Sequence, residues 1–273
     1  MQIEVEGIPI GIHERGSGRP LLMVHGWSAD HAYMVADLDP IVATHDGWRR
    51  IYFDLPGHGS TPAPDWLGNQ EQMLAIVTGI ADAVIGAEPF AVAGSSYGGY
   101  LALGLVRTLP ERLLGAALIV PDLPSAENTR DVPEALTIQP DLSLFHDLAE
   151  DEQWIPGGLV VHEQRMLDEI RAFDMPAYRA CDRAFLSRLE EHYVHQGRAG
   201  VPQAPFLKPS LVVTGLQDAT VGWRAQQELT PELPRGTFAR LDLAGHHIGR
   251  IERPSLFAAL VSDWLDRVER SLV

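Results

Sequence analysis

Gly94-Ser95-Ser96-Tyr97-Gly98 lies between an apolar, β-like run at residues 90–93 and a helix-like run at residues 100–109. A sharp turn between a strand and a helix that carries the pattern Gly-x-Ser-x-Gly is the setting of a nucleophile elbow. In that geometry the Ser96 hydroxyl is lifted above the sheet, and the flanking glycines remove side chains that would collide across the turn. Because glycine-rich chains also meet this pattern by chance, Ser96 is a candidate nucleophile whose value depends on the rest of the chain.

Length, composition and charge narrow the class of protein. The chain has 273 residues, 45% of them hydrophobic, which is enough to bury a large core in a single α/β domain. Its formal net charge of −16 would repel nucleic-acid phosphates and anionic membrane surfaces. We therefore expect a small-molecule substrate, with neither a nucleic acid nor a membrane as a partner.

The single cysteine and the start of the chain bear on location. Cys181 has no second cysteine with which to form an internal disulfide, and it cannot contribute to a thiolate cluster for a metal. Residues 1–6 alternate polar and apolar side chains, which is typical of a strand and unlike the basic start and apolar block of an export signal. The longest apolar run, residues 113–120, is too short to cross a bilayer. The sequence thus predicts a cytoplasmic protein.

Short apolar runs recur along the chain, and from the third onward helix-length segments separate most of them. This alternation predicts an α/β fold, a mostly parallel sheet with helices on both faces, in which ligands gather at the carboxyl ends of the strands. The predicted strands are residues 3–5, 8–12, 21–24, 50–53, 90–93, 114–120, 211–214 and 238–241.

One interval breaks the alternation. Residues 122–205 show helical spacing, many acidic side chains and no convincing strand, with prolines at both edges. We predict that this interval is an inserted helical cap, or lid, and that residues 1–121 and 206–273 form the core domain. Several large apolar cap residues could line a substrate pocket, although burial between helices is the more common role of such side chains: Phe145, Trp154, Leu159, Met166, Phe173 and Tyr178.

A serine hydroxyl needs a base within hydrogen-bond reach, and that base needs an acid to hold it in the right tautomer. Asp218 follows the predicted strand at residues 211–214, and His246 follows the last predicted strand. The order Ser96, Asp218, His246 predicts a serine, acid, histidine triad at the carboxyl edge of the sheet.

Each partner of Ser96 has a rival. Asp218 could instead cap a helix that starts near Val221, and Asp122, just beyond another strand, is a competing acid. His247 is adjacent to His246, and only one of the two can be the base. We prefer His246 because a glycine precedes it.

Acyl transfer also needs donors for the oxygen of the tetrahedral intermediate. The N–H of Tyr97, directly after the nucleophile, is one candidate. The loop after the third strand reads His25-Gly26-Trp27-Ser28, so the second candidate is the N–H of Trp27, and His25 is expected to brace the loop.

Taken together, these residues resemble the α/β-hydrolase family over nearly the whole chain outside the cap. The resemblance rests on His25-Gly26-Trp27, on Asp54-Leu55-Pro56-Gly57-His58-Gly59, on the elbow, and on Asp218 and Gly245-His246, in the family's order and approximate spacing. It implies a cap over the nucleophile and the Ser96–His246–Asp218 triad. Relatives commonly place an acidic residue five positions after the histidine, whereas Glu252 follows His246 by six positions and His247 by five.

The residue at the elbow limits the chemistry that this resemblance implies. Dehalogenases and epoxide hydrolases of the family need a carboxylate there, and this chain has a serine. We therefore predict a serine hydrolase, of carboxylesterase or lactonase type, that cleaves a small ester or lactone through an acyl-enzyme without a metal or organic cofactor. Carbon–carbon bond hydrolases and aminopeptidases of the fold share this machinery, and a ligand-binding protein that keeps the fold without turnover is the alternative from another class.

Overall fold

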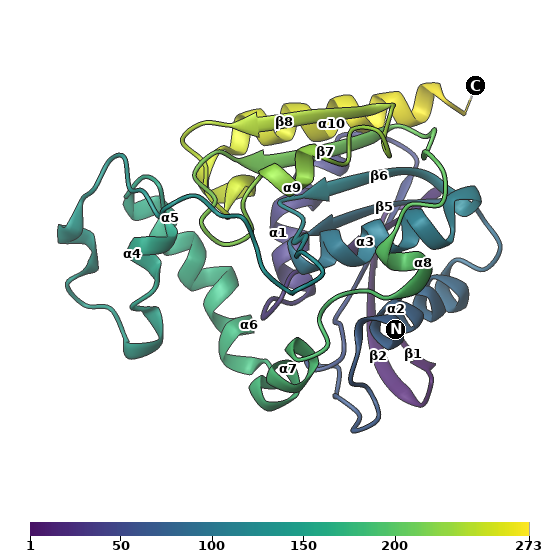
Figure 1. The fold of residues 1–273 in the computed structure, drawn as a ribbon, viewed down its shortest axis with the longest axis horizontal. Helices are drawn as coiled ribbons and strands as arrows, with labels where there is room; N and C mark the ends of the chain where they lie inside the picture. Colours follow the sequence, from purple (N-terminus) through teal and green to yellow (C-terminus); the bar gives the residue numbers. More distant parts are fainter. Residues whose placement is uncertain (273) are drawn as a thin grey trace.

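A twisted sheet of eight strands runs through the centre of the computed structural model, which describes residues 1–272 (Figure 1). The strand order is β1-β2-β4-β3-β5-β6-β7-β8, with β2 antiparallel to both neighbours and every other pair parallel. The predicted α/β fold is confirmed, and each predicted strand is found with boundaries shifted by a few residues. The strands are β1 (Gln2–Val5), β2 (Ile8–Arg15), β3 (Arg19–Val24), β4 (Trp48–Phe53), β5 (Phe90–Ser95), β6 (Leu113–Ile119), β7 (Ser210–Gly215) and β8 (Gly236–Leu241).

Helices cover both faces of the sheet. Helices α2 (Gln70–Val84) and α3 (Tyr97–Thr108) pack on one face, and α1 (His31–Val42) and α10 (Pro254–Arg270) pack on the other. Because neighbouring side chains of a strand point to opposite faces, Leu22 joins the first of these apolar layers while Leu21 joins the second. Both leucines are fully buried, and each such burial contributes about 2 kcal/mol.

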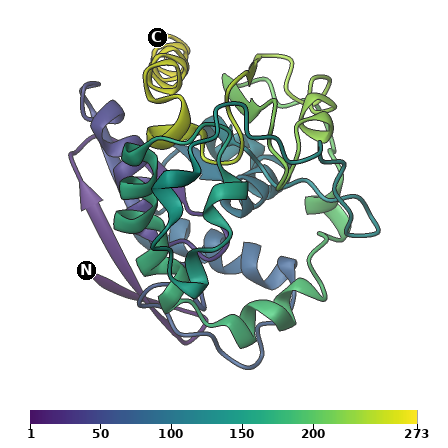
Figure 2. The same cartoon turned by 90° about the vertical axis from the view of Figure 1, so that its left-hand side faces the viewer.

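The segment at residues 122–205 lies between β6 and β7 and is built from short helices. In Figure 1 helices α4 and α5 stand to the left of the sheet and α6 and α7 lie below it, and the turned view places the segment in front of the sheet (Figure 2). It contains no strand, only an isolated bridge between Gln139 and Val161. Its helices are η2 (Leu142–Phe145), η3 (Glu150–Glu152), α4 (Ile155–Gly158), α5 (Gln164–Glu169), η4 (Ile170–Asp174), α6 (Met175–Ala180), α7 (Arg183–Glu190) and α8 (Gly197–Gly200).

This segment has an apolar cluster of its own. Ile155, Leu167 and Ile170 are buried in it together with Ile251, which comes from the stretch that follows β8. The cluster therefore ties residues 122–205 to the loop that carries His246. The remaining helices of the chain are η1 (Pro110–Arg112), α9 (Arg224–Gln227) and η5 (Ile248–Glu252).

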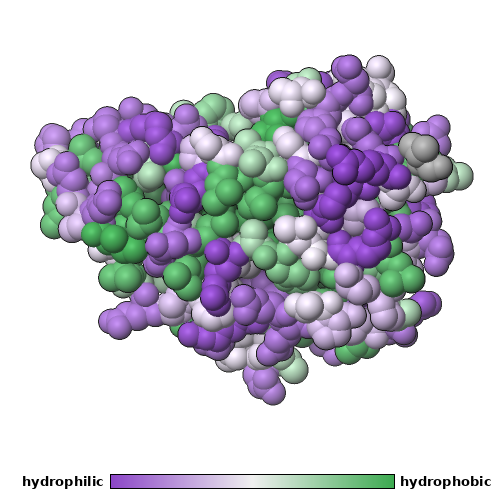
Figure 3. Space-filling view, turned by 90° about the horizontal axis from the view of Figure 1, so that it is seen from above, coloured by the Kyte–Doolittle hydropathy of each residue, from purple (hydrophilic) through white to green (hydrophobic). Residues whose placement is uncertain are grey.

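Polar and apolar residues are unevenly spread over the surface. Seen from above, hydrophobic residues gather toward the left and centre of the molecule, and hydrophilic residues dominate the right (Figure 3). Over residues 1–272, none of the helices combines the length and the apolar character that a bilayer crossing requires.

Candidate active site

Ser96 occupies a strained turn between β5 and α3. Its φ of 53° and ψ of −116° lie in a region that serine rarely adopts, and such a conformation costs about 1–3 kcal/mol. The Ser96 N–H donates to the carbonyl of Ile119 at 2.8 Å, and the Ser96 carbonyl accepts from the N–H of Asp122 at 3.0 Å. These bonds to the end of β6 hold the turn in place.

Two glycines make this turn sterically possible. A Cβ atom at Gly94 would overlap the carbonyl group of Gly98, and a Cβ at Gly98 would overlap the carbonyl group of Val24 at the end of β3. Helix α3 can therefore begin directly after the serine, at Tyr97, close against β3 and β5.

The structure brings Ser96, His246 and Asp218 together. Nε2 of His246 lies 3.0 Å from the Ser96 hydroxyl, and Nδ1 of the same ring lies 2.9 Å from Oδ2 of Asp218. The Asp218 side chain is fully buried. The three residues come from the ends of β5, β7 and β8, which meet at the carboxyl edge of the sheet.

Hydrogen bonds to Oδ1 of Asp218 fix the orientation of the carboxylate. Oδ1 accepts from the backbone N–H of Thr220 at 2.8 Å and of Val221 at 3.0 Å, which leaves Oδ2 for the imidazole. The helix expected near Val221 begins at Arg224 instead, so the carboxylate closes a turn there. Asp218 thus combines the local backbone role and the histidine contact, one with each oxygen.

Burial and pairing oppose each other in the pKa values of this pair. Burial alone would raise the pKa of the Asp218 carboxyl, but the His246 imidazole and the two backbone N–H groups outweigh it, so that the pKa lies below its ordinary value. Burial alone would lower the pKa of His246, yet the Asp218 carboxylate outweighs it and the pKa of His246 is raised. The pair therefore favours a charged carboxylate next to a basic imidazole.

Asp122, the alternative acid, and His247, the alternative base, make other contacts. The Asp122 carboxylate binds the Arg130 guanidinium through two hydrogen bonds of 2.8 Å and accepts from the Tyr193 hydroxyl at 2.7 Å. His247 places Nδ1 3.6 Å from Oδ1 of Asp174, and its ring stacks on Trp154.

The two candidate oxyanion donors belong to residues next to the serine: Tyr97 follows it in the chain, and Trp27 lines the same cavity. Among the hydrogen bonds within residues 1–272, neither the Trp27 N–H nor the Tyr97 N–H has an acceptor, and the Tyr97 N–H belongs to the open first turn of α3. The loop of Trp27 is fixed by His25, whose Nε2 accepts from the Leu55 N–H at 2.9 Å while Nδ1 lies 2.8 Å from the Gly26 carbonyl.

A cavity of about 140 Å³ opens in front of Ser96. Of the large apolar residues singled out in the 122–205 segment, Trp154 and Tyr178 line this cavity, whereas Leu159 and Met166 are buried in the segment's own apolar cluster, the role expected to be the more common one. Sequence reasoning missed Tyr33 and Asp174, which also line the cavity. The other lining residues are Gly26, Trp27, Ser28, Ala29, Ser95, Ser96, His246 and His247.

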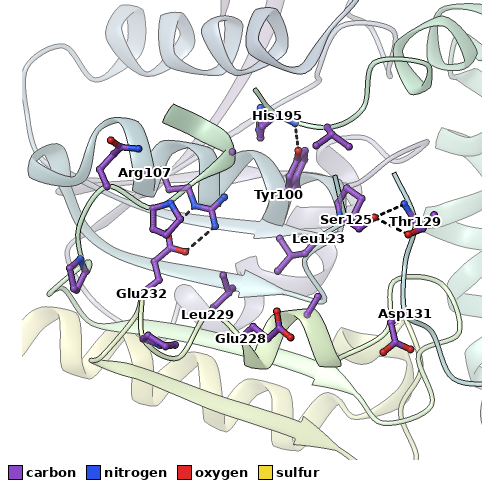
Figure 4. Close-up of a pocket in the computed structure, with 18 of the residues that line it drawn as sticks. Tyr100, Arg107, Leu123, Ser125, Thr129, Asp131, His195, Glu228, Leu229 and Glu232 are labelled. Atoms are coloured by element: carbon purple, nitrogen blue, oxygen red, sulfur yellow. Dashed lines mark hydrogen bonds and ion pairs between the residues drawn. The ribbon is translucent and has the colours of Figure 1, made fainter. Parts of the chain in front are cut away.

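A larger cavity, of about 680 Å³, lies elsewhere on the molecule (Figure 4). In it the Arg107 guanidinium is occupied by Glu232 through bonds of 2.8 and 2.9 Å, and the Tyr100 hydroxyl accepts from the backbone N–H of His195 at 2.5 Å. Ser96, Asp218 and His246 are not among its lining residues. The smaller cavity is therefore the candidate active site, because the candidate nucleophile Ser96 and the candidate base His246 both line it.

Within the described part of the chain, one group of side chains could hold a metal ion. The candidate ligand atoms of His45, Asp266 and Glu269 lie within 4.8 Å of one another. Glu269 already accepts from the Trp48 indole N–H at 2.7 Å and pairs with Arg19 at 3.3 Å. None of these residues lines the cavity in front of Ser96, so the group has no contact with the candidate triad.

Comparison with curated proteins finds relatives of several activities. A 2-hydroxymuconate semialdehyde hydrolase from Pseudomonas sp. (strain CF600) is 25% identical over 298 residues, covering all of this chain and 95% of that protein. A pimeloyl-[acyl-carrier protein] methyl ester esterase from Legionella pneumophila (strain Paris) is 31% identical over 105 residues, 38% of each chain. A dihydrolipoyllysine-residue acetyltransferase component of an acetoin cleaving system from Cupriavidus necator is 33% identical over 120 residues, 43% of this chain, and the match spans only 31% of that protein.

Solved structures show the same fold. An alpha/beta superfamily hydrolase from Oenococcus oeni PSU-1 superposes with a TM-score of 0.86 at 22% identity, covering 98% of this chain and 99% of the other. The model of the Alpha/beta hydrolase family matches residues 21–260, which include the elbow, Asp218 and His246. With this match over most of its length, the chain belongs to the alpha/beta hydrolase family.

Proposed function

We propose that this protein is a serine hydrolase that cleaves small carboxylic esters or lactones through an acyl-enzyme intermediate. The observation that carries the proposal is the continuous contact from Asp218 through His246 to the Ser96 hydroxyl, at 2.9 and 3.0 Å. Hydrogen-bond distances of this kind let an imidazole take a proton from a serine as it attacks a carbonyl.

In the proposed reaction the Ser96 oxygen attacks the carbonyl carbon, and its proton passes to Nε2 of His246. Asp218 keeps the Nδ1 proton of the ring directed at Oδ2 and stabilises the imidazolium that forms. The N–H groups of Trp27 and Tyr97 bind the developing oxyanion, and loss of one such donor typically lowers kcat on the order of a hundredfold or more. His246 then returns the proton to the leaving alcohol.

Water completes the cycle by the same route. His246 takes a proton from a water molecule as it attacks the acyl carbon, and gives that proton to Ser96 when the acid leaves. In a lactone the leaving alcohol is part of the acyl group, so the product is a hydroxy acid. Each step uses residues of this chain, and the proposal requires no metal or organic cofactor.

We further propose that residues 122–205 act as a cap that selects the substrate. This is supported by Trp154, Asp174 and Tyr178, which belong to that segment and line the cavity. A cavity of about 140 Å³ is smaller than the 300–1,000 Å³ typical of drug-sized ligands, which favours short acyl groups.

Carbon–carbon bond hydrolysis is the second candidate function. It is supported by the match with a 2-hydroxymuconate semialdehyde hydrolase along the whole chain. Esters remain our first choice because the small cavity fits a short ester. An ester is also the class of bond that the matching methyl ester esterase is named for.

Pre-steady-state kinetics with p-nitrophenyl acetate test the proposal. The native protein should release a burst of nitrophenolate close to one equivalent per chain, followed by slower turnover, because the acyl-enzyme accumulates. Ser96→Ala should show no burst, and Ser143→Ala, which alters an exposed serine, should behave as the native protein. An equal burst in Ser96→Ala would refute the assignment of the nucleophile.

A further inference from the structure

Among the residues described, the cavity in front of Ser96 is lined by one carboxylate and by no basic side chain other than the two histidines. Asp174, the last residue of η4, lines the wall together with Trp154, Tyr178 and the two histidines. Neither lysine nor arginine is among the lining residues. A substrate group placed in this cavity therefore meets the Asp174 carboxylate and neither a lysine nor an arginine.

Arg250 holds Asp174 in place from behind the wall. Its Nη2 lies 2.5 Å from Oδ2 of Asp174, its Nη1 lies 2.6 Å from Oδ1 of Asp37, and its Nε lies 3.0 Å from Oε2 of Glu169. The aromatic rings of Tyr33 and Phe173 each lie 4.9 Å from the guanidinium carbon. One guanidinium thus faces three carboxylates, and it is not among the residues that line the cavity.

The network is buried enough for its charges to act on the cavity. The side chains of Arg250, Asp37 and Asp174 are 11%, 3% and 13% exposed. Burial would lower the pKa of Arg250, but Asp37 and Asp174 outweigh it and the pKa is raised, so the guanidinium stays charged. Three carboxylates around one guanidinium leave the network with a net negative charge, and a largely buried charge repels a like-charged substrate more strongly than an exposed charge does.

We propose that the cavity accepts uncharged esters and lactones and rejects substrates that carry a carboxylate near the scissile bond, and that Asp174 is the residue that discriminates between them. This inference rests on the proposed function and specifies its substrate class. It also separates the two candidate functions, because a carbon–carbon bond hydrolase acting on an anion would need a cationic partner in this cavity.

A pair of matched esters tests the inference. Methyl succinamate and methyl hydrogen succinate have the same shape and number of non-hydrogen atoms and differ by one negative charge at neutral pH. We would measure kcat/KM for both from methanol release, using the native protein, Asp174→Asn and Asp168→Asn. Asp168 lies on the same segment, is exposed and bonds to Gln164 at 2.7 Å, so its variant removes the same charge outside the cavity.

The native protein should favour the uncharged ester by at least about tenfold, given the strength of charge repulsion in a partly buried site. Asp174→Asn should reduce that ratio by about fivefold or more, mainly through a lower KM for the anion, and Asp168→Asn should leave it unchanged. If Asp174→Asn does not fold, Glu169→Gln should shift the ratio in the same direction by about twofold, since it also removes a carboxylate from Arg250.

Contrary outcomes have distinct meanings. Equal rates for the two esters, a preference for the anion, or an unchanged ratio in Asp174→Asn would overturn the inference and leave the proposed function standing. If neither ester turns over, the same pair is tested as competitors of fluorophosphonate labelling at Ser96, where the uncharged ester should protect at about tenfold lower concentration or less. A native protein that the fluorophosphonate does not label would contradict the proposed function, and this inference with it.

Discussion

Oδ2 of Asp218 lies 2.9 Å from Nδ1 of His246, across 28 positions of the chain that include all of β8. The other oxygen of the carboxylate is fixed by two backbone N–H groups, so the side chain cannot turn away without breaking them. In the proposed mechanism this contact sets the tautomer of the imidazole that faces Ser96.

Replacing each candidate acid in turn should therefore show whether Asp218 or Asp122 serves as the acid of the triad. We expect Asp218→Asn to lower kcat by on the order of a thousandfold or more, because an amide no longer fixes the productive tautomer. Asp122→Asn should lower kcat far less. It should instead reduce the free energy of unfolding by about 2 kcal/mol, because Arg130 loses a charged partner. Steady-state kinetics and urea unfolding of both variants measure these effects, and the reverse ranking in kcat would assign the acid to Asp122.

The adjacent histidines should also differ. His246→Ala should abolish hydrolysis, because it removes the base 3.0 Å from the Ser96 hydroxyl. His247→Ala should keep most of the catalytic rate and alter KM, because His247 lies on the cavity wall against Trp154 and Asp174. Activity lost in His247→Ala but kept in His246→Ala would show that the base was assigned to the wrong residue.

The raised pKa of His246 predicts the pH profile. The imidazole must be neutral to accept a proton, so kcat/KM should fall as the pH drops, with a midpoint above the ordinary value of 6.5. In Asp218→Asn the carboxylate is gone and burial remains, so the midpoint should move to lower pH. A profile of kcat/KM against pH for both proteins measures this shift, and an unmoved midpoint would argue against the pairing.

The same pKa has a consequence for stability. A histidine whose pKa is higher in the folded than in the unfolded state stabilises the fold below its unfolded pKa, and that contribution is lost as the pH rises through the folded pKa. The free energy of unfolding lost in His246→Ala should therefore be larger in mildly acidic than in alkaline buffer. Urea unfolding at the two pH values provides the measurement.

Glycine substitutions test the geometry of the elbow. Gly94→Ala should lower the free energy of unfolding by about 3 kcal/mol, because the new methyl group would overlap the Gly98 carbonyl. Gly68→Ala is the matched control, since no atom lies within 4 Å of a Cβ built there, and its effect should stay within about 0.5 kcal/mol. Similar urea midpoints for the two variants would contradict the close packing described at the elbow.

Local patterns were sufficient to predict the elements that carry the site. The apolar run of β5, the glycines and the apolar helix that follows are contiguous, so the strand–turn–helix unit could be recognised without long-range contacts. The predicted start of α3 was late by three residues, because the helix begins directly after the strained Ser96. Asp218 and His246 could be found because each follows an apolar strand whose end must lie at the same edge of the sheet.

The cavity wall could not be predicted in the same way. Asp174 lies in a segment of short helices without a sustained period, and its partner Arg250 is 76 positions further along the chain. Arg250 also donates a hydrogen bond to Asp37, which lies 213 positions earlier in the chain. No local sequence pattern predicts the contacts of Arg250 with Asp174 and Asp37, because they depend on how the 122–205 segment packs against the loop that follows β8. The aromatic residues of that segment were visible as candidates, but only packing decided that Trp154 and Tyr178 face the cavity while Leu159 is buried elsewhere.

The most direct test of the account is whether Ser96 is an activated nucleophile. We would treat the native protein and Ser96→Ala with a fluorophosphonate and measure intact mass, which requires no knowledge of the substrate. The account predicts a single adduct on the native protein and none on Ser96→Ala. An unlabelled native protein, or equal labelling of the two proteins, would contradict the claim that Ser96, His246 and Asp218 form a working catalytic triad.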